Sequence, residues 1–319
     1  MITFINPRMQ KRFESELSVT QSEVSLLLEF FPKGVCAFDL EMTGLSPIFD
    51  KIIEIAAIKI LPFGKVETFH TLINPLIPIP EHTIQYHGLT NEILRNAPAL
   101  KKPFKEFQEF YEHLPLIAHN AQFDIGFLVI ALNELNLNPS LSDIYDSCKA
   151  ARALLRNSSN PPKSFKLNDL AQYYAIEFDH HKALDDALVC LKIFIQALKF
   201  IKENDPKLNI KNIGFLYKLN SFQKSTSYIL PNKFSKLKTY VTNQTDIYIK
   251  YKGGSHRGKF RPVRPISLLP MPSGNVLYAH CLLSDIYKSF ALGKIQSVKE
   301  LDAKEIQERL FNLSQKPGK

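Results

Sequence analysis

The sequence predicts a two-domain protein in which an α/β domain with a mixed sheet precedes a smaller, mostly β domain. Three observations support this prediction. The chain has 319 residues, more than a single hydrophobic core comfortably serves. Strand and helix patterns alternate as far as residue 204, and short β-like runs with turn signals dominate after it. Hydrophobic residues make up 45% of the chain, which is enough to build ordinary globular cores.

The α/β part opens with a short helix and three strands. A Thr-x-x-Glu capping signature starts a helix at 20–31. Apolar runs rich in β-branched residues predict strands at 34–40, 51–60 and 65–73. The connections between these strands are short, so we expect antiparallel neighbours.

Helical and strand patterns then alternate along the chain. We expect helices at 101–114, 122–137, 148–156, 167–175 and 182–204, with strands at 115–120 and 143–148. A three-stranded meander followed by β-α-β-α units gives a mixed sheet with helices packed on it.

A polar segment that contains a proline, 204–212, marks the expected domain boundary. The chain is accordingly divided into an N-terminal helical extension (1–32), an α/β domain (33–203), a linker (204–245) and a basic β domain (246–319) with a C-terminal helix from about residue 298.

Cysteine usage and the lack of long apolar segments predict a reduced, cytoplasmic protein. The four cysteines lie far apart and include no Cys-x-x-Cys pair. The N-terminal segment has no apolar run followed by a small-residue cleavage site, as a secretion signal would. No stretch approaches the ~18 uninterrupted apolar residues of a membrane span, so we expect no membrane partner.

Positive charge is concentrated towards the C-terminus. The formal net charge is +9, and residues 211–284 hold 12 Lys or Arg residues against a single acid, Asp246. Such a region is typical of a polyanion-binding surface, although a solvated basic face would have the same composition. The aromatic residues interleaved with these cations suit stacking on single-stranded nucleic acid, or alternatively belong to the core of short strands.

Four acids and one histidine stand at the ends of predicted elements. Asp39 and Glu41 lie two residues apart at the end of an apolar strand, so their side chains share one face. Mutual repulsion and burial would disfavour their ionisation unless solvent or a cation compensates. Asp124 starts a helix after a strand, and His181 and Asp186 lie at the start of the long helix. Taken singly, each of these residues could instead be a solvated or capping side chain.

Together, the fragments resemble a known family. Asp-x-Glu at 39–41, Asn-x-x-Phe-Asp at 120–124 and His-x4-Asp at 181–186 resemble the three motifs of the DEDDh (DnaQ-like) 3′–5′ exonucleases. The segments 73–94 and 165–174 resemble the family's intervening segments, so the likeness runs from about 33 to 203. The resemblance implies an RNase H-like fold.

The resemblance also implies a two-metal mechanism with Mg²⁺ or Mn²⁺, two ions per site. Phosphodiester hydrolysis requires charge to be stabilised on the attacking and leaving oxygens, and carboxylates are ligands that Mg²⁺ prefers. Asp39 would approach both ions, Glu41 and Asp186 would bind the first, and Asp124 would hold the second through water. His181 would be the general base that activates the attacking water. The His-x4-Asp spacing selects Asp186 over its neighbour Asp185.

Further residues are candidates for substrate binding. Five of them lie beside the motif acids, where the family contacts the 3′-terminal nucleotide or supports a metal ligand: Thr43, Gly44, Leu45, His119 and Asn120. Leu45 would be the wedge beside the terminal base. Met42 stands where the family more often has threonine.

The segment 246–301 resembles, less closely, a WYL domain, a small Sm/SH3-like β-barrel thought to bind nucleic acid or nucleotide-like ligands. The Trp-Tyr-Leu trio that names that domain is Asn275-Val276-Leu277 here. Candidate ligand contacts are Lys288 and Lys294, which stand where the family usually has arginines, together with Arg261 and Arg264.

The sequence therefore predicts a metal-dependent 3′–5′ exonuclease that releases nucleoside 5′-monophosphates, with a basic C-terminal domain that binds nucleic acid or a ligand. Its expected partners are 3′ ends of single-stranded DNA or RNA, and the expected role is DNA repair or turnover. One alternative is a proofreading subunit like the epsilon subunit of DNA polymerase III, with a DNA polymerase as partner. The other is a non-catalytic regulator that responds to nucleic acid.

Overall fold

The computed structural model describes residues 19–222, 230–254 and 256–301, except for the gap at 178–181. The chain forms two compact units. Among the described residues, the first comprises those up to Thr43 together with those from Lys51 to Ser221. The second comprises Gly44–Asp50 and the described residues from Phe222 onwards.

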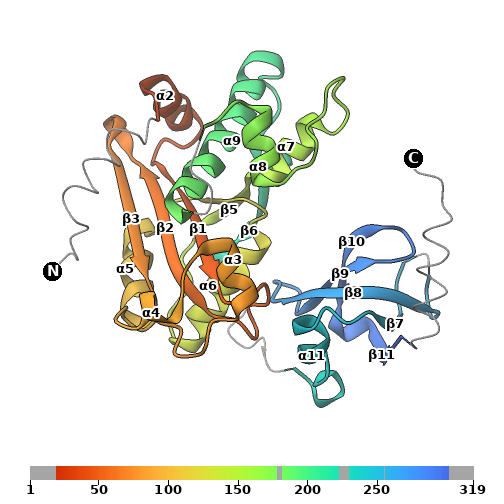
Figure 1. Ribbon diagram of the computed structural model, residues 1–319. Coiled ribbons are helices and arrows are strands. Elements are labelled where there is room, and N and C mark those ends of the chain that lie inside the picture. The colour runs from red at the N-terminus through yellow and green to blue at the C-terminus, as the bar shows by residue number, and fades with distance from the viewer. Residues whose placement is uncertain (1–18, 178–181, 223–229, 255, 302–319) are drawn as a thin grey trace. The chain divides into compact units, whose positions relative to one another are not determined.

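The first unit is built on a six-stranded mixed sheet with the order β3-β2-β1-β4-β5-β6 (Figure 1). Its strands are β1 (Val35–Met42), β2 (Ile52–Ile60), β3 (Val66–Leu72), β4 (Leu116–Ala118), β5 (Asp143–Asp146) and β6 (Phe215–Lys218). Strands β1, β2 and β3 form an antiparallel meander, whereas β4 and β5 continue the sheet in parallel to β1. The predicted α/β fold with a mixed sheet is confirmed.

Helices flank this sheet. They are α2 (Gln21–Phe30), α3 (Glu81–His87), α4 (Asn91–Leu94), α5 (Lys101–Tyr111), α6 (Gln122–Glu134), α7 (Ser147–Leu155), α8 (Leu167–Tyr173), α9 (Ala183–Asn204) and α10 (Ile210–Ile213). The long helix α9 packs on β1 and β2 (Figure 1). Alternation along β1 directs Val35 and Ala37 into the core that α9 contributes to, whereas Phe38 packs on Phe107 of α5.

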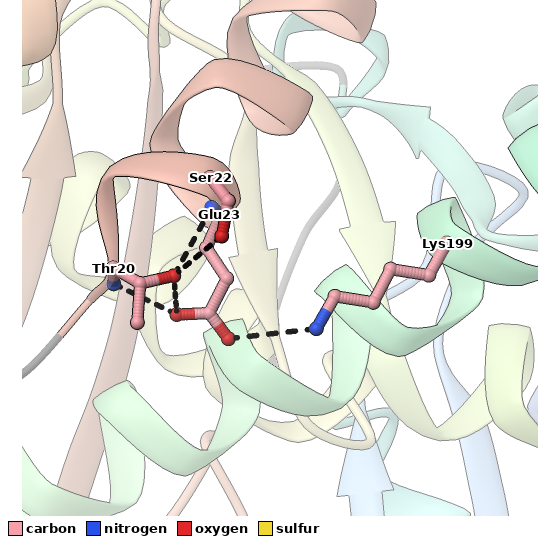
Figure 2. Close-up of polar contacts among 4 residues, drawn as sticks. All are labelled: Thr20, Ser22, Glu23 and Lys199. Atoms are coloured by element: carbon pink, nitrogen blue, oxygen red, sulfur yellow. Dashed lines mark hydrogen bonds and ion pairs between the residues drawn. The ribbon is translucent and has the colours of Figure 1, made fainter.

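The start of α2 is fixed by the predicted capping box (Figure 2). The backbone N–H of Glu23 donates to Thr20 Oγ1 over 3.2 Å, and the N–H of Thr20 donates to Glu23 Oε2 over 2.9 Å. The other carboxylate oxygen of Glu23 lies 3.8 Å from Lys199 Nζ on α9. Two otherwise unpaired helix donors are thereby satisfied, and the helix start is connected to α9.

Replacing Thr20 with alanine is expected to lower the free energy of unfolding by about 1 kcal/mol, because an N-cap acceptor is lost. The conservative change Thr20→Ser keeps the acceptor and should cost little. Urea denaturation of the three proteins would measure both effects. Equal stabilities for Thr20→Ala and wild type would contradict a stabilising role of this cap.

The second unit is built on a five-stranded, fully antiparallel sheet with the order β10-β9-β8-β7-β11. Its strands are β7 (Ile247–Tyr251), β8 (Phe260–Leu269), β9 (Val276–Cys281), β10 (Ile286–Ala291) and β11 (Ile295–Glu300), and its helix is α11 (Leu237–Thr242). Apolar side chains of α11 and of the strands form its core. The predicted smaller β domain is confirmed as a separate antiparallel sheet.

Short 3₁₀ turns complete the list of helical elements, at η1 (Pro62–Gly64), η2 (Leu219–Ser221), η3 (Asn232–Phe234) and η4 (Leu292–Lys294).

The structure differs from the expected division of the chain at two places. Segment 204–245, expected as a linker, contains β6, which pairs antiparallel with β5 and extends the first unit to Ser221. A helix was expected from about residue 298, but Val298–Glu300 is the end of β11, where Val298 pairs with Ile249 of β7. The remainder of that expected helix, 302–319, lies outside the described residues, as does 1–18 of the expected N-terminal extension.

In the part of the chain that the structure describes, no helix combines the length and apolar character that a membrane span requires. The four cysteines are buried and form no disulfide bond.

Candidate active site

Strand β1 and helix α9 together bring three carboxylates into one cluster. Asp39 and Glu41 continue the face of β1 that carries Val35 and Ala37, the face on which α9 packs. Asp186 lies in the first turn of α9. One carboxylate oxygen from each of Asp39, Glu41 and Asp186 lies within 4.8 Å of the others.

Asp124 adds a fourth carboxylate from a different element. It lies in the first turn of α6, directly after β4 and its turn, and only 6% of its surface is exposed. Burial raises the pKa of Asp124, and hydrogen bonds from the backbone N–H groups of Asp124 itself and of Leu40 on β1 offset part of that rise. Asp124 is also the nearby charge that contributes most to raising the pKa of Asp39. The structure therefore brings all four acids from the three sequence motifs together.

Burial and like charge suppress ionisation of these acids in the metal-free protein. Burial, followed by Glu54 and the other cluster acids, raises the pKa of Glu41 to about 8. Burial raises the pKa of Asp124 to about 7, and burial together with Asp185 and Glu54 raises that of Asp186 to about 7. The pKa of Asp39 is raised well above its usual range, by burial first and then by the surrounding carboxylates.

This donor set fits a divalent cation. Several carboxylate oxygens converge within ligand-sharing distance, and oxygen ligands of this kind suit Mg²⁺ or Mn²⁺. All the charges that raise the pKa of Asp39 are carboxylates, so a bound cation would offset an otherwise uncompensated repulsion. Asp39, Glu41 and Asp186 are the residues placed to hold it, with Asp124 beside them.

A fifth acid, Glu54, was not anticipated from the sequence. It lies on β2 directly opposite Glu41 and is buried, with 8% of its surface exposed. Its Oε1 lies 2.5 Å from Nε2 of His70 on β3. Its charge contributes to the raised pKa of Asp39, Glu41 and Asp186. The single acid in the apolar run "KIIEIAAIKI" was the available signal, because an acid inside a buried strand requires a partner.

Asp146 is a second unanticipated acid, and it organises the turn ahead of Asp124. It caps α7 and accepts hydrogen bonds from the backbone N–H groups of Asn120 (3.0 Å), Cys148 (2.9 Å) and Lys149 (3.2 Å). Asn120 adopts a left-handed backbone conformation, with φ at 57°. The hydrogen bond from Asn120 therefore holds an uncommon turn that leads into α6.

His119 acts on the same turn. Its Nε2 donates to the carbonyl oxygen of Phe165 over 3.0 Å, which leaves Nδ1 to accept from the Ser147 hydroxyl over 2.8 Å. Burial lowers the pKa of His119 to about 4, so the ring is neutral near pH 7. The hydrogen bonds of His119 to Phe165 and Ser147 therefore anchor the turn before Asp124. His181, the expected general base, lies outside the described residues.

Residues 44–50, which follow the two acids of β1, fold with the second unit. The hydroxyl of Ser267 donates to the Leu45 carbonyl over 2.7 Å, and the N–H of Leu268 donates to Ser46 Oγ over 3.1 Å. Ile48 and Phe49 pack against the core of that unit. The loop that connects β1 to β2 is thus held by residues more than 200 positions later in the chain.

Three predicted substrate contacts lie at or in this loop. Thr43 is buried, and its hydroxyl accepts the N–H of Lys51 over 3.0 Å. A Cβ at Gly44 would lie 2.5 Å from the Asp50 carboxylate, which accepts the N–H of Ser46, so a side chain at position 44 would require that carboxylate to move. Leu45, the expected wedge, is 50% exposed.

The four basic residues expected to bind a ligand in the second unit have different surroundings. Arg261 is buried (5% exposed) and donates to Cys281 Sγ over 3.1 Å, so a solvent-facing phosphate contact is not available to it in this structure. Arg264 is exposed and pairs with Asp246 at 2.8 and 3.0 Å. Lys288 is half-buried, and Lys294 is exposed.

Comparison with known proteins defines the class of the first unit. Residues 36–194 match the model of the RNase T family, described as Exonuclease. This part of the chain therefore belongs to that exonuclease family. The mixed sheet with flanking helices is accordingly the RNase H-like fold.

The similar curated proteins are much longer polymerases. The chain is 35% identical over 195 residues to a DNA polymerase III PolC-type of Caldanaerobacter subterraneus subsp. tengcongensis, covering 61% of this chain and 13% of the relative. It is 31% identical over 273 residues to the corresponding protein of Clostridium perfringens, covering 83% of this chain and 18% of the relative. The chain thus spans less than a fifth of either relative.

Similar solved structures include the nuclease domain of 3′hExo, described as a DEDDh family member bound to rAMP. That likeness has a TM-score of 0.47 at 17% identity, covering 59% of this chain and 98% of that one. Exonuclease X in complex with 5′ overhanging duplex DNA has a TM-score of 0.40 at 20% identity, covering 55% of this chain and 97% of that one.

Proposed function

We propose that this chain is a 3′–5′ exonuclease that hydrolyses single-stranded DNA or RNA to nucleoside 5′-monophosphates with the help of two Mg²⁺ or Mn²⁺ ions. Its C-terminal unit binds nucleic acid or a nucleotide-like ligand. The observation that carries the proposal is the convergence of Asp39, Glu41, Asp124 and Asp186 inside a domain of the exonuclease family.

In this proposal, the side chains of the cluster perform separable tasks. Asp39, Glu41 and Asp186 hold the cations, and Asp124 completes the set from the α6 side. Bound divalent cations supply charge stabilisation for the attacking and leaving oxygens of the phosphodiester. His181 takes the proton of the attacking water. The charge of Glu54 raises the pKa of Glu41 and of Asp186, so both carboxylates depend on a cation to ionise near neutral pH.

The test is digestion of oligonucleotides that carry a label at the 3′ or the 5′ end, with DNA and RNA in parallel, in Mg²⁺, Mn²⁺ or EDTA. We expect metal-dependent release of the 3′ label as a mononucleotide and a ladder of shortened 5′-labelled products. EDTA should abolish both. Shortening from the 5′ end would contradict the polarity. Intact strands that are still bound under every condition would favour the non-catalytic regulator.

A proofreading role is the second candidate, and the similarity to PolC-type polymerases favours it. A proofreading nuclease should remove a mismatched 3′-terminal nucleotide from a primer faster than a matched one, because the mismatched end is frayed. Excision rates on paired primer–templates measure this preference. Equal rates on the two primers would favour a free-standing repair or turnover enzyme.

A further inference from the structure

The five-stranded sheet of the second unit has two faces of different chemistry. One face carries the apolar side chains of the core, among them Ile247, Ile249 and Leu277. Residues that pair directly across antiparallel strands share a face, so the strand register identifies the members of the opposite one. This opposite side, called the outer face here, carries Tyr248, Lys250, Phe260, Pro262, Arg264, Ser267, Tyr278, His280, Tyr287, Ser289, Ser297 and Lys299.

Aromatic rings form two groups on the outer face. On β9 and β10, the rings of Tyr278 and Tyr287 stack at 8° and 5.7 Å, and His280 lies 4.9 Å from Tyr287. On β7 and β8, the rings of Tyr248 and Phe260 meet edge to face at 6.1 Å. Tyr287 is 61% exposed and Phe260 is 41% exposed. Large aromatic surface kept in water indicates a binding surface.

Cations lie among these rings. Lys299 Nζ lies 4.8 Å from the ring centre of Tyr248 and 5.0 Å from that of Phe260. Arg264 lies on β8, between the two groups of rings, directly opposite His280. Asp246 accepts from two of its N–H groups, and a guanidinium has five, so three donors are not used by that pair.

The surroundings of the outer face add positive charge. Exposed Lys252, Arg257 and Lys259 lie in the hairpin between β7 and β8, directly before Phe260. Residues 211–300 hold 15 Lys or Arg residues against three acids, of which Asp246 pairs with Arg264, Asp285 pairs with His280, and Glu300 ends β11. Four inter-strand spacings of ~4.8 Å make this face roughly 19 Å wide, which is room for several nucleotides. A polyanion with accessible flat bases complements this charge and this aromatic surface.

We propose that the outer face binds single-stranded nucleic acid, with bases stacked on Tyr287, Tyr278 and Phe260 and phosphates paired with Arg264, Lys250 and Lys299. This inference rests on the proposed function, because it assumes that the chain acts on nucleic-acid strands. It extends that function by naming the surface that binds the strand and by specifying that the bound strand is single. Stacking requires unpaired bases, so duplex should bind more weakly.

The experiment measures binding of the full chain to a labelled 20-nucleotide strand and to the matching duplex by fluorescence anisotropy in EDTA. Tyr287→Ala and Phe260→Ala should each weaken strand binding about tenfold, because one stacking surface is lost. Tyr287→Phe keeps the ring, so its strand affinity should stay within about twofold of wild type. Lys299→Gln should reduce the salt dependence of binding by about one counterion.

Leu283→Ala is the matched control, since Leu283 is 50% exposed in the same β9–β10 hairpin but lies outside the strands. It should bind the strand like wild type. Unchanged strand affinity in the Tyr287→Ala, Phe260→Ala double variant would overturn the proposal and leave the face to a protein partner. Equal losses in Leu283→Ala and Tyr287→Ala would overturn it as well.

A minimal substrate separates this inference from the proposed function. The p-nitrophenyl ester of thymidine 5′-monophosphate reports on hydrolysis without a strand, so the variants of the outer face should hydrolyse it like wild type. If wild type hydrolyses the ester but the ring variants bind the strand as tightly as wild type, the binding role of the outer face is wrong and the proposed nuclease stands. If the ring variants lose strand binding but wild type does not hydrolyse the ester, the proposed nuclease is wrong and the binding role of the outer face stands.

Discussion

Asp186→Ala is expected to reduce strand cleavage by at least about 10³-fold, and Asp39→Ala is expected to do the same. Each change removes an oxygen donor from a cluster whose ligand atoms lie within 4.8 Å of one another. Charge stabilisation by bound cations contributes several kcal/mol to a displacement of this kind, and each ~1.4 kcal/mol is tenfold in rate. Initial rates on a 5′-labelled strand in Mg²⁺ measure the loss.

Strand binding by these variants should remain within about threefold of wild type, because stacking and phosphate contacts elsewhere supply most of the affinity. Asp185→Ala is the matched control, one residue away on α9, and should retain most of the activity. Loss of activity in Asp185→Ala alone would show that the wrong carboxylate of the pair has been assigned. Equal loss of binding and cleavage in Asp186→Ala would contradict a purely chemical role for Asp186.

Local patterns were sufficient to predict the elements that carry the acids. The short apolar runs at 34–40 and 51–60 predicted two strands, and the two-residue separation of Asp39 and Glu41 placed both on one face. The Thr20–Glu23 capping box was confirmed for the same reason, since all its hydrogen bonds lie within four residues.

Features that depend on distant partners could not be predicted. Segment 204–245 begins with the polar stretch 204–212 and was interpreted as a linker, yet it contains β6, which pairs at the edge of the sheet with β5, about 70 residues earlier in the chain. The same limit applies to Ser46 and Leu268, whose hydrogen bond spans 222 positions. Glu54 became part of the site only once the antiparallel register placed it opposite Glu41.

One difference between the expected site and the structure could have been predicted from strand geometry. Arg261 and Arg264 are three residues apart on β8, and an odd separation on a strand directs two side chains to opposite faces. One of the pair therefore had to point inwards. The structure shows Arg261 in that position, against Cys281 and the ring of Phe290, with Arg264 on the outer face.

The second prediction with a large effect is that the metal-free protein loses stability as pH rises from about 4 to about 8. The pKa values of Glu41 (about 8), Asp124 (about 7) and Asp186 (about 7) are raised above their ordinary values of 4.5, 3.8 and 3.8. A raised pKa favours the folded state while the group stays protonated, so this stabilisation is complete below about pH 4. It is lost as pH rises through the folded-state pKa.

Because each unit of pKa shift corresponds to 1.36 kcal/mol, the loss should reach at least about 2 kcal/mol between pH 5 and pH 8.5 in EDTA. Urea denaturation at the two pH values measures it. Mg²⁺ should restore stability at pH 8.5, since a cation favours the ionised carboxylates. Stability that rises between these pH values in EDTA would contradict the raised pKa values.

The affinity for a metal ion should depend on the same protonation steps, but it should rise with pH, whereas the stability of the metal-free protein falls. Carboxylates must lose their protons to bind a cation, so each released proton makes affinity rise tenfold per pH unit, or about 100-fold for two protons between pH 6 and 7. Glu54→Gln removes a charge that raises the pKa of Glu41 and Asp186, and should therefore move this rise to lower pH. Glu67→Gln, on β3 and paired with Lys59, is the control and should leave it in place. Calorimetric titration with Mn²⁺ at four pH values measures the affinity of each protein. If the pH dependence of affinity is identical for wild type and Glu54→Gln, Glu54 is not part of the site.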